Sequence, residues 1–222
     1  MQKEQRYSPT DELSGNTRNS PVQTYKTPAG TVFLRSSCSP AFVADLKVDE
    51  GLRALARLPE REHQLLLTLS GKPENRLTLA FTASGIFICQ VTLAPLDSQW
   101  QDLENAYEIA VEVSTGWRRM GIAQQLLALT LNYKSLEESL IIAFGLSWHW
   151  DFTGLGISRF DYRELIARLF AAHGFSEYLT TDQNIRMDPA NILVARLGSR
   201  LAEESINRFF QHLLYSETLP GL

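Results

Sequence analysis

The feature that most constrains the fold is a change of hydrophobic periodicity in the middle of the chain. From Tyr107 to Val113 the sequence YEIAVEV alternates between two faces, which predicts a half-buried strand with Glu108 and Glu112 on its polar face. From Ile122 onward the apolar residues recur at i, i+4 and i+7, the spacing of one face of a helix. The chain must therefore change from strand to helix within a short loop. The apolar strand face carries Ile109, Val111 and Val113, and the apolar helix face carries Ile122, Leu126 and Leu129.

Other segments extend this pattern into an α/β fold (an α+β mixed sheet) with helices on its faces. A turn at residues 27–30 separates two short strand-like segments, which predicts a first hairpin. Leucine-rich helical patterns over residues 52–69 end at a breaker, and a last helix is predicted to open with Ser199 as its N-cap. This order leaves both a Rossmann-type and an acyltransferase-type arrangement open. Further strands are predicted at residues 76–82, 85–93, 140–146 and 191–197, a further helix at 158–174, and buried positions of the last helix at Ile206, Phe209, Phe210 and Leu213.

Composition limits the classes to which the protein can belong. With 222 residues, 44% of them hydrophobic, the chain can bury one large core, and we expect a single domain over residues 23–222. Residues 1–22 are polar, which predicts a disordered tail. The net charge of −4 argues against general binding to nucleic acid, and no apolar run approaches the ~18 residues of a membrane span. Cys38 and Cys89 show neither metal nor disulfide spacing, so we expect buried thiols and a reducing, cytoplasmic location.

The loop and helix start at residues 116–127, GWRRMGIAQQLL, combine the features of an anion site. The first backbone N–H groups of a helix lack intrahelical partners, and the helix dipole adds partial positive charge there. Gly121 lets the backbone approach a ligand closely, and Ala123 leaves the next turn unobstructed. Arg118 or Arg119 can pair with phosphate oxygens, so the loop suits a pyrophosphate. The chain carries neither a P-loop nor a dinucleotide fingerprint, because Gly71-Lys72 lacks the upstream glycine of the first motif and Arg159 stands where Gly154-Leu155-Gly156 would need the third glycine of the second.

The spacing Arg118-x-x-Gly121-x-Ala123 resembles the acetyl-CoA-binding signature of the GCN5-related N-acetyltransferases (GNAT). The resemblance implies a GNAT-type acyl-CoA N-acyltransferase fold, acetyl-CoA as co-substrate, and no metal. It also implies that the strand at Val113 bonds the pantetheine arm and that amides of the loop bind the pyrophosphate. The implied cofactor-binding residues are Val113, Arg118, Arg119, Met120, Gly121, Ile122, Ala123 and Gln124.

A second stretch, WHWDFTGLG at residues 148–156, resembles the acetoin-utilisation acetyltransferases of bacteria, and the run Asp188-Pro189-Ala190-Asn191 supports the same family. The resemblance covers roughly residues 25–215. It implies a protein lysine acetyltransferase that acetylates the active-site lysine of acetyl-CoA synthetase and so switches that enzyme off. Two alternatives stay open, a non-catalytic acyl-CoA sensor that binds the synthetase and an acetyltransferase for small amines.

A lysine ammonium must lose a proton before its nitrogen attacks a thioester, so a proton acceptor is expected. Glu108 and Glu112 are candidates, because in related acetyltransferases a glutamate on this strand serves as the base; each can equally be a solvated or salt-bridged residue. The position that matches, eleven before Arg118, is Tyr107, so Glu108 fits only if the strand contains a bulge. His149 is the third candidate, since a neutral imidazole accepts protons near pH 7. A histidine between two tryptophans can also be a packed core residue.

Aromatic and acidic residues nearby have predicted supporting roles. Asp151 either orients the histidine of its stretch or caps the turn, and Trp148 and Trp150 are expected to build the acceptor-side wall. Many relatives donate a proton to the leaving thiolate from a tyrosine, and this chain has Phe170 at that position. Tyr162 is a substitute, although its place in an apolar helical stripe favours packing.

Overall fold

The computed structural model describes residues 21–53, 58–96, 100 and 102–215. The predicted tail at residues 1–22 thus lies almost entirely outside the described residues. The chain divides into two compact units, the first formed by residues 1–92 and 111–130 and the second by residues 93–110 and 131–222. Strands β5 (Ile86–Pro95) and β6 (Ala106–Val113) contribute residues to both units. The single domain expected from the sequence stays a prediction.

The first unit contains a sheet in which β1, β2, β4 and β5 are neighbours in that order. Its other elements are β1 (Gln23–Thr27), β2 (Gly30–Arg35), α1 (Pro40–Ala44), β3 (Lys47–Val48), α2 (Pro59–Ser70), β4 (Arg76–Thr82) and α3 (Ile122–Leu131). β1 and β2 form the predicted hairpin, with Thr27 opposite Gly30. The two-residue β3 pairs in parallel with β5, which fixes the chain just before residue 49 onto the sheet.

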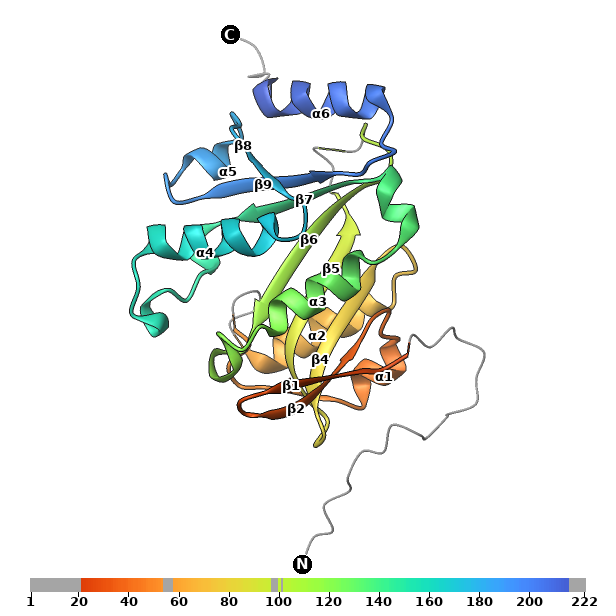
Figure 1. Ribbon diagram of the computed structural model, residues 1–222, viewed down its shortest axis with the longest axis vertical. Coiled ribbons are helices and arrows are strands. Elements are labelled where there is room, and N and C mark those ends of the chain that lie inside the picture. Colours follow the sequence, from red (N-terminus) through yellow and green to blue (C-terminus); the bar gives the residue numbers. More distant parts are fainter. Residues whose placement is uncertain (1–20, 54–57, 97–99, 101, 216–222) are drawn as a thin grey trace, which may run out of the picture. The chain divides into compact units, whose positions relative to one another are not determined.

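Helices cover both faces of this sheet. Leu77, Leu79 and Phe81 of β4 belong to the cluster that packs against α1 and α2. The alternate residues Thr78 and Ala80 are also fully buried, on the face where α3 lies (Figure 1). A strand that is buried on both faces explains why RLTLAFT is a nearly continuous apolar run.

The second unit joins β6, β7, β9 and β8 in that order. Its elements after β6 are the short 3-10 turns at 134–138 and 153–155, β7 (Leu140–Gly145), the 3-10 turn η4 (Ser147–His149), α4 (Arg159–Ala171), β8 (Ser176–Tyr178), α5 (Gln183–Arg186), β9 (Ile192–Leu197) and α6 (Glu203–Tyr215). Phe209 and Leu213 of α6 pack on one face of the sheet, and α4 lies against the opposite face (Figure 1). Ser158 and Asp161 cap α4 reciprocally, which is why this helix starts at Arg159.

The parallel pairing of β6 with β7 is short. It joins Ala106 to Leu140 and ends where Glu108 faces Ile142. β7 nevertheless continues to Gly145, and β6 continues beyond this point as well. Toward their carboxyl ends, these two strands are therefore no longer paired with each other within the described chain.

The observed elements confirm the predicted mixed α/β fold, and two details of the last helix are corrected. Ser199 is not the N-cap of α6, because the helix begins at Glu203 and Ile206 N–H donates to the carbonyl of residue 202. Ser199 instead donates from its N–H (3.1 Å) and its hydroxyl (2.7 Å) to the carboxylate of Glu137. These bonds, together with Arg196, lower the pKa of Glu137 to about 2. Phe210, expected to be buried, is 43% exposed.

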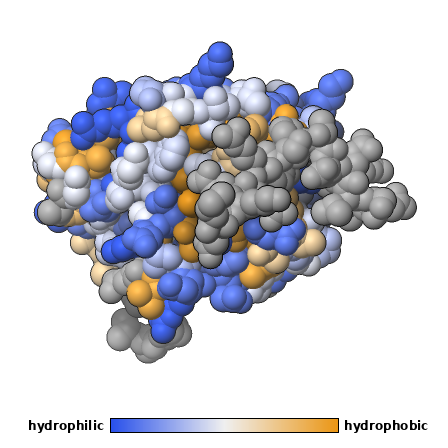
Figure 2. All heavy atoms as spheres, turned by 90° about the horizontal axis from the view of Figure 1, so that it is seen from below, coloured by the Kyte–Doolittle hydropathy of each residue, from blue (hydrophilic) through white to orange (hydrophobic). Residues whose placement is uncertain are grey.

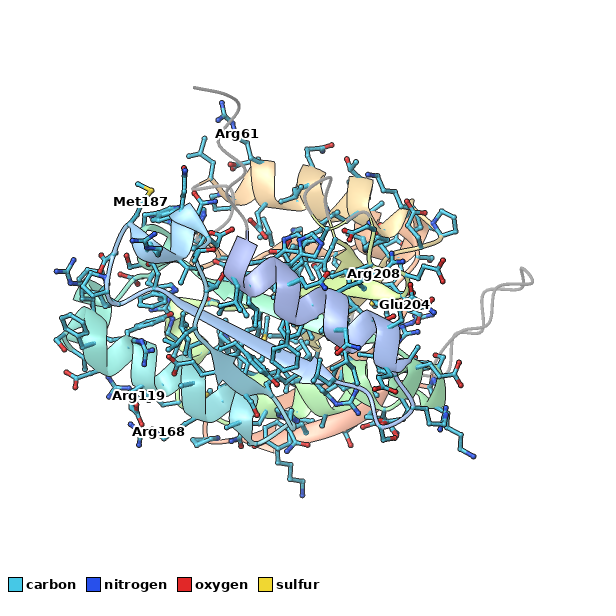
Figure 3. The ribbon with its side chains drawn as sticks, turned by 90° about the horizontal axis from the view of Figure 1, so that it is seen from above. Arg61, Arg119, Arg168, Met187, Glu204 and Arg208 are labelled. Carbon is cyan, nitrogen blue, oxygen red and sulfur yellow. The ribbon has the colours of Figure 1, made fainter. Side chains whose placement is uncertain are left out.

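The surface is mixed in polarity. Seen from below, hydrophilic residues dominate the coloured part of the surface, with hydrophobic ones scattered between them (Figure 2). On α6, Glu204 and Arg208 lie side by side (Figure 3) and form an ion pair of 2.5 Å. None of the helices in the described ranges combines the length and the hydropathy that a membrane span requires.

Candidate functional site

The loop between β6 and α3 has an unusual backbone. After the 3-10 turn at residues 115–117, Arg119 adopts φ of 62° and Gly121 adopts φ of 75°. A positive φ is uncommon for a residue that is not glycine, and such residues gather at ligand-binding loops. The loop leads into α3 at Ile122, so its conformation decides how the first amides of the helix are presented.

Gly121 is required for two independent reasons. Its φ lies in the left-handed region, and a Cβ added at this position would lie 2.6 Å from the Tyr25 hydroxyl oxygen. That hydroxyl donates a hydrogen bond of 3.1 Å to the carbonyl of Met120. Tyr25 of the first hairpin thus supports the loop from outside. Sequence reasoning did not identify Tyr25 as part of the site, because 95 residues separate it from Met120.

One arginine of the predicted anion site is engaged with the loop itself. Arg118 Nε donates to the carbonyl of Val113 at 3.2 Å, and Gln125 N–H donates to the carbonyl of Gly121 at 3.2 Å, which starts the helix. The N–H groups of the first residues after Gly121 have no acceptor inside the helix. Arg118 thus stabilises the turn, and anion binding by the backbone of this loop stays a prediction.

Residues 49–53 are hydrogen-bonded to the carboxyl end of β6 and to the residue after it. Glu112 accepts a hydrogen bond of 2.6 Å from the backbone N–H of Arg53. Asp49 accepts hydrogen bonds from the hydroxyl of Ser114 and from the N–H of Gly51, the latter at 2.9 Å. Residues 49–53 are thereby held against the strand that leads into the loop. No motif marks Asp49, so sequence reasoning missed it.

The environments of the two predicted glutamates differ. Glu108 is exposed, as expected for the polar face of the strand, whereas Glu112 is only 6% exposed. The alternative in which Glu112 is a solvated residue is therefore wrong, and its role as a base stays a prediction. The physical reason is that residues 49–53 cover this end of β6 and supply a main-chain donor to the carboxylate.

In the second unit, the WHWD stretch presents two ring side chains and buries part of a third. Trp148 is 45% exposed and His149 is exposed, with their ring centroids 5.9 Å apart. Trp150 instead stacks on Tyr162 with centroids 5.2 Å apart. Asp151 accepts the N–H of Gly154 at 3.1 Å, as the turn-capping interpretation requires. Tyr162 thus packs against Trp150, as its apolar stripe predicted.

Phe170 fills a core position. It is 4% exposed and contacts Phe175 edge-on, with ring centroids 5.0 Å apart. The two cysteines are buried and free, as expected. Burial raises the pKa of the Cys38 thiol to about 12 and, together with the charge of Glu112, raises that of Cys89 further. Within the described part of the chain, no three His, Cys, Asp or Glu side chains gather in a way that could hold a metal ion.

No model of a protein family matches the chain. Over 189 residues, it is 31% identical to the acetoin utilization protein AcuA of Bacillus licheniformis, a match that covers 83% of this chain and 89% of that protein. The chain belongs to this family. The crystal structure of the acetoin utilization protein from Exiguobacterium sibiricum matches with a TM-score of 0.83 and 29% identity, covering 90% of this chain and 97% of that one.

More distant solved structures share the fold. A phosphinothricin acetyltransferase of the GNAT superfamily from Sinorhizobium meliloti, solved in complex with acetyl-CoA, matches with a TM-score of 0.50 and 18% identity, over 74% of this chain and 87% of that one. These matches confirm the predicted GNAT fold and the acetoin-utilisation family, and acetyl-CoA-dependent N-acetyl transfer is taken up below as a proposal. The site residues, the protein acceptor and the cytoplasmic location stay predictions.

Proposed function

We propose that the protein is a lysine N-acetyltransferase that uses acetyl-CoA to acetylate acetyl-CoA synthetase and so inactivates it. The observation that carries the proposal is the loop after β6, where Arg119 and Gly121 both adopt positive φ immediately before the first turn of α3. This backbone supports an anion site made of main-chain amides, which suits the pyrophosphate of coenzyme A. The family name supports a role in acetoin utilisation.

The cofactor binds to the residues that the sequence predicts. Amides from Arg119 to Gln124 bind the pyrophosphate, and Arg118 holds the turn through the Val113 carbonyl. The backbone of β6 at Val113 bonds the pantetheine arm. The GNAT neighbour from Sinorhizobium meliloti was solved with acetyl-CoA bound, which supports this cofactor.

The reaction moves an acetyl group from sulfur to nitrogen. The acceptor ammonium, with an unperturbed pKa near 10.4, first gives up a proton. The free amine then attacks the thioester carbonyl carbon and the new C–N bond forms. As the C–S bond breaks, the nitrogen loses a second proton to give the amide, and coenzyme A leaves as a thiolate that takes up a proton. Glu108, Glu112 and His149 are the proposed proton acceptors. Phe170 cannot donate to the thiolate, so the leaving group takes its proton from another source.

The experiment that tests the proposal is incubation of the purified protein with acetyl-CoA and acetyl-CoA synthetase. Acetylated lysines are mapped by mass spectrometry, and synthetase activity is measured in the same samples. We expect stoichiometric acetylation of one lysine with parallel loss of synthetase activity. A synthetase that binds and is controlled without being acetylated would point to the acyl-CoA sensor. Faster transfer to a polyamine than to the synthetase would point to the small-amine enzyme.

The three proposed proton acceptors can be separated by single substitutions. Glu108→Gln, Glu112→Gln and His149→Ala are each assayed for the rate of acetylation against pH. Loss of the acidic limb of the profile in one variant, with acetyl-CoA affinity unchanged, identifies the base, since general acid–base catalysis contributes roughly 10²–10⁴-fold. Glu112→Gln also removes charge from the bond to Arg53, so its melting temperature is recorded beside its rate.

A further inference from the structure

Ser147, the residue directly before the exposed Trp148, is held from two sides by polar side chains. The carbonyl oxygen of the Asn191 side chain accepts the Ser147 N–H at 2.7 Å, and the Asp188 carboxylate accepts the Ser147 hydroxyl at 2.9 Å. Arg159 Nη1 donates to the same Asp188 oxygen at 2.8 Å. We call Ser147, Arg159, Asp188 and Asn191 the Ser147 anchor. It joins three segments that are distant in sequence, and all of its members lie in the second unit.

The anchor is itself fixed by its own turn. The N–H of Ala190 donates to Asp188 at 2.9 Å, and the side-chain amide of Asn191 donates to the carbonyl of Asn184 at 2.6 Å. The Ala190 N–H, the Ser147 hydroxyl and Arg159 together lower the pKa of Asp188 below its ordinary value. Ser147 and Asn191 are both buried. The run Asp188-Pro189-Ala190-Asn191 is thus held by its own hydrogen bonds in the conformation that binds Ser147.

A second set of contacts fixes the chain three residues further on. Trp150 stacks on Tyr162, and its N–H donates to the carbonyl of Ser147 at 3.2 Å. Gly145 makes room for this ring, since a Cβ there would lie 3.3 Å from Cζ2 of Trp150. Only Trp148 and His149 lie between the two fixed points. Both are exposed, so buried polar groups fix the backbone next to two surface side chains.

We propose that Asp188 and Asn191 are positioning residues that act through Ser147 to hold Trp148 and His149 for the acceptor lysine. The inference rests on the proposed transfer of acetyl groups to a protein lysine. A short exposed turn that is fixed in advance loses little conformational entropy when the acceptor arrives, and small displacements of a reacting group lower rates sharply. A role in packing alone would not require the anchor to converge on the residue next to the exposed pair.

The test compares anchor variants with a matched ion pair from the same helix. Asp188→Asn, Asn191→Ala and the milder Ser147→Ala weaken the anchor. Glu177→Gln is the control, because it removes the partner of Arg163 on α4 without touching the anchor. Initial rates are measured with acetyl-CoA synthetase as acceptor at saturating acetyl-CoA, and the KM for acetyl-CoA is measured separately.

We expect kcat/KM for the synthetase to fall about tenfold or more in Asp188→Asn and Asn191→Ala, and by less in Ser147→Ala. The KM for acetyl-CoA stays within about twofold, because backbone amides in the first unit bind the cofactor. Glu177→Gln behaves as wild type. Hydrogen exchange at the amides of residues 147–150 accelerates in the anchor variants alone. Anchor variants whose kcat/KM equals that of Glu177→Gln would overturn the inference, whatever their hydrogen exchange.

A double-mutant cycle separates positioning from general destabilisation. If Asn191 acts through the exposed pair, Trp148→Ala removes what Asn191 positions, and the double variant Trp148→Ala/Asn191→Ala is little worse than either single variant. Additive losses would show that Asn191 acts elsewhere and would overturn the proposal. A wild-type protein that transfers no acetyl group to the synthetase refutes the proposed function instead, and positioning for transfer falls with it. Hydrogen exchange then still shows whether the anchor fixes the turn.

Discussion

The loop after β6 and the turn after β7 both follow the carboxyl end of a strand, but they are built by different means. The first is shaped by its backbone: Arg119 and Gly121 have positive φ, and Tyr25 contacts main-chain atoms of the loop. The second is held by side chains, since Asp188 and Asn191 bond Ser147. The first arrangement therefore depends on a glycine, and the second depends on a carboxylate and an amide.

This difference matches what each region is proposed to bind. A pyrophosphate is the same in every catalytic cycle, so main-chain amides, which no substitution except proline removes, are sufficient donors. A protein acceptor is recognised by side chains that differ among proteins, and these side chains need a fixed base. We therefore expect the first loop to tolerate changes of side chain better than changes of backbone, and the second region to show the opposite sensitivity.

The largest effect is expected at Gly121. Gly121→Ala forces a Cβ to within 2.6 Å of the Tyr25 hydroxyl at φ of 75°. Backbone strain alone costs ~1–3 kcal/mol, so we expect the Kd for acetyl-CoA to rise roughly 10- to 100-fold. Isothermal titration calorimetry measures it. Gly116→Ala in the same loop is the control, because no atom lies within 4 Å of a Cβ there. Equal Kd values for the two variants would refute the backbone account.

The clash and the strain at Gly121 can be told apart. Tyr25→Phe removes the hydroxyl and leaves the next ring atom 3.7 Å from the added Cβ. The double variant Tyr25→Phe/Gly121→Ala should recover part of the affinity lost in Gly121→Ala, with the remaining loss due to φ. No recovery would mean that Tyr25 does not limit the space at this position.

A smaller effect, a loss of thermal stability, is expected where residues 49–53 contact the loop. Gly51→Ala places a Cβ 2.6 Å from Oγ1 and 2.8 Å from the backbone nitrogen of Thr115. Overpacking costs ~1–3 kcal/mol, which corresponds to a drop in melting temperature of about 5 °C for a chain of this size. Differential scanning fluorimetry measures this drop. Gly71→Ala is the control, since its nearest neighbour is 3.5 Å away. A Gly51→Ala protein as stable as this control would show that the segment is not tied to the loop.

The sequence predicted the elements whose signals are local. The strand at 76–82 has the expected bounds and the first hairpin turns at residues 27–30 as predicted, because periodicity and turn residues act over a few positions. Gly121 was identified for the same reason, since its motif is contiguous with the start of the helix. Ser199 was assigned wrongly because a serine near acidic residues matches an N-cap locally, whereas Glu137, 62 residues away, captures it.

The parts of the site that the sequence did not predict are contacts between segments that are distant in sequence. Tyr25 and Asp49 carry no motif of their own, and they matter only because the fold brings them to residues 120 and 114. The burial of Glu112 has the same origin, because residues 49–53 cover it. Periodicity places a residue on a face of its own strand, but it does not say which other segment covers that face.

A smaller effect is expected when the pH is lowered, because the turn after β7 depends on the ionised carboxylate of Asp188. Because its pKa is lowered in the folded state, Asp188 contributes stability above the ordinary aspartate pKa of about 3.9 and loses this contribution as pH falls through the lower folded value. The amide signal of Ser147 in an NMR titration should therefore shift with a midpoint below 3.9, and Asp188→Asn should abolish the shift. The amide of Gln125 at the cofactor loop should not follow it. A midpoint at or above 3.9 would show that Asp188 is not stabilised as a carboxylate.

The smallest effect concerns thiol reactivity, which reports on the first unit alone because both cysteines lie there. Burial raises the thiol pKa values, Cys38 to about 12, so iodoacetamide at pH 8 should react with neither until the unit opens. Asp188→Asn should leave the labelling rate within about twofold of wild type, whereas Gly51→Ala should raise it. Mass spectrometry of timed samples measures the rate. If weakening the Ser147 anchor exposed the cysteines as much as Gly51→Ala does, the two regions would open together, and the different construction of the loop and the turn would have no separate consequence for stability.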